Sequence, residues 1–165
     1  MITKQQLADA MIKECDICIH LHSKLGADSA EYRPGPGQRS TAELLRYLAA
    51  SAIGGMTSLK ANDWNKYGEY AGRVKDMTVA EFPAAMTRMR DEIKAFFANT
   101  TDAELQQDAT MFGGDKAPLA YAILIGPFKW LTAYKLQLFL YAKASGAAAI
   151  GTSNAWGGMD AKPAA

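Results

Sequence analysis

The sequence predicts an all-α fold, an up-and-down-type four-helix bundle with long linkers. Three features of the 165-residue chain support this fold class. A helix-start motif recurs, apolar residues repeat with the period of an α-helix, and no segment alternates apolar and polar residues as a half-buried strand does. The length corresponds to one domain.

The helix-start motif is the capping box, in which a Ser or Thr and a Glu or Gln three residues later bond each other's backbone N–H groups. These boxes and two stop glycines, Gly26 and Gly146, define where helices begin and end. The boxes are Thr3/Gln6, Ser40/Glu43, Thr78/Glu81 and Thr101/Glu104. We expect long helices at about 3–25, 41–61, 79–98 and 118–145, a helical turn near 102–107, and linkers at 26–39, 62–77 and 99–117.

Each predicted helix has one apolar face. In the first, Cys15, Cys18 and His22 lie on the inward face. His20 lies on the polar side, four residues after Asp16, where an exposed helical pair is the ordinary explanation, and we assign it no role. In the second helix, the small residues of 49–55 predict close approach by another helix or a ligand, because glycine is costly in mid-helix.

The last predicted helix is long and apolar enough to resemble a membrane span. Its central Lys129 and Lys135 argue against one, since each costs about 2.5–3.5 kcal/mol in a bilayer centre. We expect the most buried helix of the bundle, kinked near Gly126–Pro127. The bundle should occupy residues 1–146, and the Ala/Gly-rich tail 147–165 should be loose, with Ile150 and Trp156 as the side chains able to dock.

Composition excludes several classes of protein. The net charge of +1 argues against a nucleic-acid binder, whose binding face needs a basic excess. Two cysteines make no disulfide framework and fit a reducing compartment. The first residues contain no apolar signal core. We therefore expect a cytoplasmic protein that binds neither nucleic acid nor membrane.

Two segments resemble a known family. The stretch Tyr32–Leu48, with Tyr32-Arg33-Pro34 and Gly37-Gln38-Arg39-Ser40, resembles the loop and second helix of the DinB-like family. Residues 133–138, followed by Tyr141 and Gly146, resemble its last helix. The resemblance covers the chain to about Gly146 and implies a four-helix bundle. Many members are assigned as metalloenzymes, so a metal- or thiol-dependent transferase or hydrolase is the activity that it implies.

The chain departs from this family at the metal ligands. Metal-binding members carry one histidine in the middle of the second helix and two, four residues apart, in the last. The matching positions here are Tyr47, Trp130 and Tyr134. Tryptophan has no metal-binding atom, and a neutral phenol is a poor ligand beside imidazole. We therefore expect neither a metal at this site nor a cofactor.

The substituted positions predict an aromatic-lined pocket instead. The last helix presents Trp130, Tyr134, Gln137 and Tyr141 on one face, because 3.6 residues make a turn. Such polar-tipped aromatic rings suit a small organic ligand; alternatively, they simply fill the space between the helices. The full set of pocket candidates is Tyr47, Ser51, Trp130, Tyr134, Gln137, Tyr141 and His22.

Three other features of the sequence have more than one interpretation. Cys15, Cys18 and His22 share one helix face and form an alternative metal set, although buried cysteines usually serve as core residues. The first linker carries Arg33 and Arg39 beside a helix start, but its prolines remove the N–H donors that a phosphate cradle uses. In the second linker Trp64, Tyr67 and Tyr70 should cap a bundle end or form a dimer contact.

The sequence thus leads to three hypotheses of function. The first is a small-molecule-binding protein that uses the aromatic pocket and no metal. The second is a metal- or thiol-dependent enzyme of the DinB-like type. The third is a dimeric scaffold without a ligand. We expect a homodimer in addition.

Overall fold

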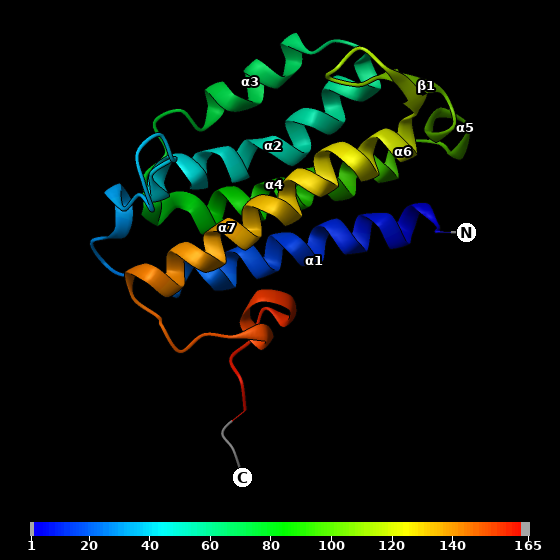
Figure 1. Ribbon diagram of the computed structural model, residues 1–165. Helices are drawn as coiled ribbons and strands as arrows, with labels where there is room; N and C mark the ends of the chain where they lie inside the picture. Colours follow the sequence, from blue (N-terminus) through cyan, green and yellow to red (C-terminus); the bar gives the residue numbers. More distant parts are fainter. Residues whose placement is uncertain (1, 163–165) are drawn as a thin grey trace.

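Four long helical segments form the bundle in the computed structural model, which describes residues 2–162 (Figure 1). The all-α bundle predicted from the sequence is confirmed. The last segment contains a π-helical turn around Pro127, where the kink was predicted. The segments are α1 (Lys4–His22), α2 (Thr41–Ala61), α4 (Phe82–Ala98), and a composite of α6 (Leu119–Ile123), the π-helical turn η3 (Leu124–Phe128) and α7 (Lys129–Ser145).

All four predicted capping boxes form. Three of them open α1, α2 and the short helix α5 (Asp102–Leu105). The box at Thr78 opens a 3-10 turn, η2 (Val79–Glu81), and α4 begins only at Phe82. Pro83 follows in the first turn of α4, where its missing N–H costs nothing because the first helical N–H groups have no intrahelical partner.

The box at the start of α2 carries an extra contact. Glu43 Oε2 accepts from the Ser40 backbone N–H at 2.7 Å and from Arg33 Nη1 at 2.7 Å. These bonds, that from Arg33 first, lower the pKa of Glu43 to about 2. The ionised carboxylate therefore ties the first linker to the beginning of α2.

Acid should weaken this link. A carboxylate whose pKa is depressed in the folded chain contributes stability above its ordinary pKa and loses it as the pH falls to the folded value. We expect the urea midpoint to fall between about pH 5 and about pH 2, and to fall less in Glu43→Gln. The exposed Glu69→Gln serves as control and should follow the wild-type curve. A Glu43→Gln curve that overlays the wild type would contradict this account.

The helix directions differ from a simple alternation. Near the start of α2, Arg46 Nε donates to Met77 O at 2.9 Å, just before α4. Near its end, Lys60 Nζ donates to Asn99 O at 3.0 Å, just after α4. Helices α2 and α4 therefore run parallel. The linker between them contains an unpredicted helix, α3 (Asn65–Arg73), which runs back along the outside of α2 and makes the parallel order possible (Figure 1).

The third linker contains a small hairpin that the sequence did not predict. Strands β1 (Asp108–Thr110) and β2 (Lys116–Pro118) pair antiparallel, with Ala109 opposite Ala117. Gly114 takes a positive φ of 94° in the turn between them. Strands of three residues are too short for a clear alternation of apolar and polar residues, so the sequence contains no pattern that predicts them.

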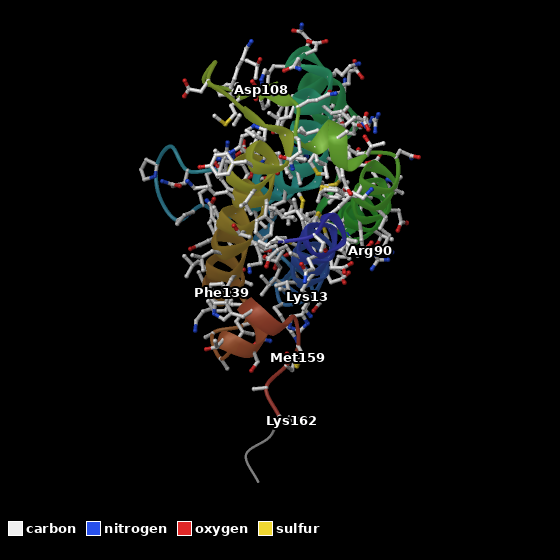
Figure 2. All side chains as sticks on the ribbon, turned by 90° about the vertical axis from the view of Figure 1, so that its right-hand side faces the viewer. Lys13, Arg90, Asp108, Phe139, Met159 and Lys162 are labelled. Atoms are coloured by element: carbon white, nitrogen blue, oxygen red, sulfur yellow. The ribbon has the colours of Figure 1, made fainter. Side chains whose placement is uncertain are left out.

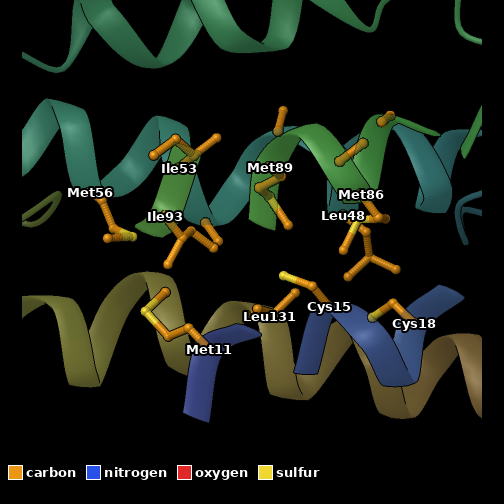
Figure 3. Close-up of a cluster of buried hydrophobic side chains, with 14 of the residues drawn as sticks. Met11, Cys15, Cys18, Leu48, Ile53, Met56, Met86, Met89, Ile93 and Leu131 are labelled. Carbon is orange, nitrogen blue, oxygen red and sulfur yellow. The ribbon is translucent and has the colours of Figure 1, made fainter. Parts of the chain in front are cut away.

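The core lies between α1, α2, α4 and α7, and methionines contribute much of it (Figure 3). The most buried helix is α2, not the last helix as predicted. The reason is α3, which covers the outer side of α2: a Cβ on Gly54 would lie 3.1 Å from Tyr70 Cβ. The last segment keeps more of its outer face exposed, and Tyr121 and Leu140 are each 54% exposed.

The described part of the tail packs on the bundle and is not loose as predicted. Ile150 is buried, and a π-helical turn, η4 (Ser153–Gly157), lies against α1 and α7, below Lys13 and Phe139 in Figure 2. Lys13 Nζ donates to Gly157 O at 2.7 Å. Residues 163–165 lie outside the described residues. A 3-10 turn in the first linker, η1 (Ser29–Glu31), completes the elements.

His20 bonds to this tail and not to Asp16. Its Nε2 lies 3.0 Å from Asn154 Nδ2, which donates to it, while Asp16 pairs with Arg90 at 2.9 Å. Burial and the charge of Lys24 lower the pKa of His20, in agreement with a neutral ring that accepts this bond. Sequence spacing within α1 could not show a partner more than a hundred residues away.

Lys135 is the unexpected member of the last helix. Its side chain is 2% exposed, and its Nζ lies 2.8 Å from Glu14 Oε2, at an angle outside hydrogen-bond geometry. The Trp156 ring of the tail covers the ammonium group, with its centre 4.7 Å from Nζ. The buried ion pair therefore joins α7, α1 and the tail. Over the described chain, no helix has both the length and the hydropathy that crossing a membrane requires.

Candidate functional site

Three tyrosines and one arginine meet where α2, α3 and α7 come together. The rings of Tyr47 and Tyr134 are 4.4 Å apart between centres. Tyr67, on α3, lies beside Tyr47, close enough for each phenol group to influence the pKa of the other. The Arg39 guanidinium lies over Tyr47 and Tyr134, with its Cζ 4.6 and 5.2 Å from the ring centres. We call these four residues the tyrosine cluster.

Two hydroxyls of the cluster, those of Tyr47 and Tyr67, lie where burial opposes ionisation. Partial burial raises the pKa of Tyr47 and that of Tyr67, because a phenolate would lose solvation there. The hydroxyls of Tyr67 and Tyr134 make no hydrogen bond of good geometry to another group among residues 2–162, so both can bond to a ligand.

Ser51 and Trp130 lie deeper along the same seam. Ser51 is fully buried one turn from Tyr47, and its Oγ has no hydrogen-bond partner. Trp130 packs against the next turn, where a Cβ on Gly55 would come 2.7 Å from Trp130 Cζ3. The predicted close approach at the small residues of α2 is therefore confirmed. Trp130 also faces Trp64, 6.2 Å between ring centres, and thus fills the seam.

Gln137 and Tyr141 have partners of their own. Gln137 Nε2 donates to Tyr141 Oη at 2.7 Å, and the Tyr141 hydroxyl donates to Arg39 O at 2.8 Å. Tyr141 is buried and its ring also meets Tyr32 edge-on. These two hydrogen bonds hold the backbone of the first linker at Arg39 and so fix where Arg39 enters the cluster.

His22 is not brought to the cluster. Its Nε2–H donates to Val79 O at 2.8 Å, and its ring lies 5.6 Å from that of Phe82. Val79 lies in η2 and Phe82 begins α4, so His22 bonds to a backbone carbonyl beside α4 and to no residue of the cluster.

The two cysteines point into the core (Figure 3). Burial, more than the neighbouring charges of Asp16 and Glu14, raises the pKa of Cys15 to about 12, and burial also raises that of Cys18. Both are therefore thiols at neutral pH, and a thiol is a weak nucleophile and a weak ligand. No three His, Cys, Asp or Glu side chains of residues 2–162 come together so as to hold a metal ion.

The positions that carry histidines in metal-binding DinB-like proteins do not fit a metal here. Tyr47 and Tyr134 contact each other ring to ring, and Trp130 presents carbon atoms to Gly55. Neutral phenols whose ionisation is opposed by burial are poor zinc ligands. We therefore derive no step that involves a metal at this place.

A separate hollow lies at the other end of the bundle. It has a volume of about 570 Å³ and is bounded by the start of α1, α5 and α6, with Leu7, Leu105 and Tyr121 in its wall. Its lining is mostly apolar and includes none of the residues predicted for the pocket. It offers a control site for any test of the tyrosine cluster.

Two cluster residues were not among the predicted pocket residues. Arg39 was considered only as part of a phosphate loop, and Tyr67 only as an end cap or dimer contact. The signal for Tyr67 was present, because Trp64, Tyr67 and Tyr70 recur every three residues as one face of a short helix does. For Arg39 no signal in the sequence shows which aromatic rings it meets.

The arrangement of these helices is the fold of DinB-like proteins. A crystal structure of a DinB-like protein from Bacillus subtilis, YjoA, matches with a TM-score of 0.71, over 89% of this chain and 96% of that one, at 16% sequence identity. A likeness at this identity shows a common fold. No family model matches the chain, and no curated protein matches it in sequence.

Proposed function

We propose that this protein binds a small organic molecule at the tyrosine cluster and uses no metal to do so. The observation that carries the proposal is the convergence of free donors on one aromatic surface. The hydroxyls of Tyr67 and Tyr134 and the guanidinium of Arg39 come from two helices and a linker. Aromatic walls with a few placed polar groups are typical of small-molecule sites.

The ligand would bind at the outer rim of the cluster. The rings of Tyr47 and Tyr134 are in contact, so the space between α2 and α7 is filled at this level. Arg39 is exposed and covers both rings from the solvent side. A bound molecule would therefore lie beside Arg39, on the exposed ring edges, with the two free hydroxyls as its donors.

Removing single hydroxyls tests this proposal. A fragment set of alcohols, amides, amines and carboxylic acids is first screened by thermal shift. Tyr67→Phe and Tyr134→Phe keep the rings, and each should weaken the best fragments by about 3-fold to 10-fold, the worth of one hydrogen bond. Dissociation constants are measured by calorimetry.

The control is Tyr121→Phe in the hollow at the other end, where a hydroxyl is also exposed. It should leave these dissociation constants unchanged. Binding that responds to Tyr121→Phe but to neither cluster variant would place the ligand in the hollow and contradict the proposal. Fragments that bind the wild type and all three variants equally would contradict it too.

The other hypotheses stay predictions. A thiol-dependent enzyme finds no support in two buried thiols with raised pKa values. The predicted homodimer is tested by measuring the oligomeric state of the protein in solution. The exposed Leu136 and Leu140 on the outer face of α7 are the first residues to substitute if a dimer is found.

A further inference from the structure

The first linker carries two arginines with different surroundings. Arg33 Nη1 is 2.7 Å from Glu43 Oε2 and also donates to Gln38 O at 2.7 Å. Its charge and its donors are therefore used within the fold. Arg39 has no carboxylate at ion-pair distance and no acceptor for its guanidinium N–H groups in the part of the chain that the structure describes.

The Arg39 guanidinium is held against two aromatic rings, with its Cζ 4.6 Å from the centre of the Tyr47 ring and 5.2 Å from that of Tyr134. These cation–π contacts use none of its N–H groups as hydrogen-bond donors, so the donors stay available. Its backbone is fixed as well, because the Tyr141 hydroxyl donates to Arg39 O at 2.8 Å. The result is a positioned fork of unused donors at the rim of the cluster.

The positive charge of Arg39 has no negative partner within the cluster. No acidic side chain of the described chain pairs with Arg39, and its neighbours in the cluster are phenol rings. We infer that the ligand of the proposed site is a small organic carboxylate, held by two parallel bonds from Arg39 while its apolar body packs on the tyrosine rings. This inference rests on the proposed function and adds the chemical class of the ligand.

A carboxylate fits better than a phosphate group. A guanidinium fork matches the two oxygens of a carboxylate in one plane. Phosphate sites add backbone N–H groups or further positive charges, but Pro34 and Pro36 lack the N–H and Arg33 is occupied by Glu43. One free charge beside aromatic rings therefore favours a singly charged anion with an apolar body.

The test uses matched pairs of probes on the full chain, beginning with benzoate and benzamide, which share ring and size and differ in charge. We expect benzoate to bind at least about 10-fold more tightly than benzamide, because charge-assisted bidentate bonds are the stronger kind. Arg39→Gln should remove that advantage, so that the two probes bind equally. Arg39→Lys should keep only part of it, since lysine keeps the charge and loses the fork.

Arg33→Gln is the matched control, because it removes one positive charge from the same linker. It should leave the preference for benzoate intact, and circular dichroism verifies that each variant is folded. An equal loss in Arg33→Gln and Arg39→Gln would overturn the inference, since it would show only a general effect of charge. Equal binding of both probes, weakened by Tyr134→Phe, would overturn the carboxylate but support the proposed function. Binding that no cluster variant changes would overturn both.

Discussion

Replacing Lys135 by methionine is expected to lower the free energy of unfolding by about 3 kcal/mol, because it leaves a charge without its partner in the interior. Lys135 is 2% exposed and Glu14 15% exposed by side chain, and their charged atoms lie 2.8 Å apart. Methionine keeps the volume of the side chain, so the loss should come from the charge. Urea unfolding followed by circular dichroism measures it.

A double replacement separates charge from packing. Glu14→Met with Lys135→Met removes both charges and should recover most of the loss, since well-packed apolar residues often replace a buried pair at little cost. Lys129→Met, at an exposed position of the same helix, should change the free energy of unfolding by less than about 0.5 kcal/mol. If the double variant is no more stable than Lys135→Met alone, the pair is not the source of the loss.

Replacing Gly26 by alanine should also destabilise the fold. At this point the chain after α1 crosses the end of α7, and an added Cβ would overlap the carbonyl oxygen of Ser145. On the other side, a Cβ on Gly146 would lie 2.8 Å from Gly26 Cα, so each backbone blocks the other. We expect a loss of about 1–3 kcal/mol, as for overpacked sites, measured as a lower midpoint of thermal unfolding.

Gly68→Ala is the matched control for this change. Gly68 lies within α3, and a Cβ there meets no atom within 4 Å. Alanine should therefore stabilise the chain slightly, by up to about 1 kcal/mol, through its better helix propensity. Opposite signs for the two glycines are the expected result. A neutral Gly26→Ala would show that the crossing relaxes freely.

The sequence was most informative where the interactions are local. A capping box involves residues three positions apart, and all four boxes form as predicted. The π-helical turn around Pro127 is also a local effect, because proline disrupts the helical hydrogen bonds of its own turn. The small residues of α2 predicted a close approach, which Gly55 and Trp130 confirm.

The sequence was least informative where segments distant in the chain meet. The tail binds His20 through Asn154, and periodicity within α1 cannot show that. Helix α3 is short and has no fully buried side chain, yet it sets the direction of α4 and brings Tyr67 to the site. Tyr47 and Tyr134 were predicted to face each other and do so, but Arg39 completes the cluster from a linker.

The parallel course of α2 and α4 has a consequence for how the chain folds. Helix α1 packs mainly on α4 and α7, and α2 on α3, α7 and α4, so the long helices in contact are mostly far apart in sequence. Bundles made of local helical hairpins fold fast because their short loops close early. Two helices that are far apart in sequence pack together only after a long loop has closed, which has a larger entropic cost. The first two long helices are not a packed pair in the fold, and the last helix joins α1 to α2 through the core.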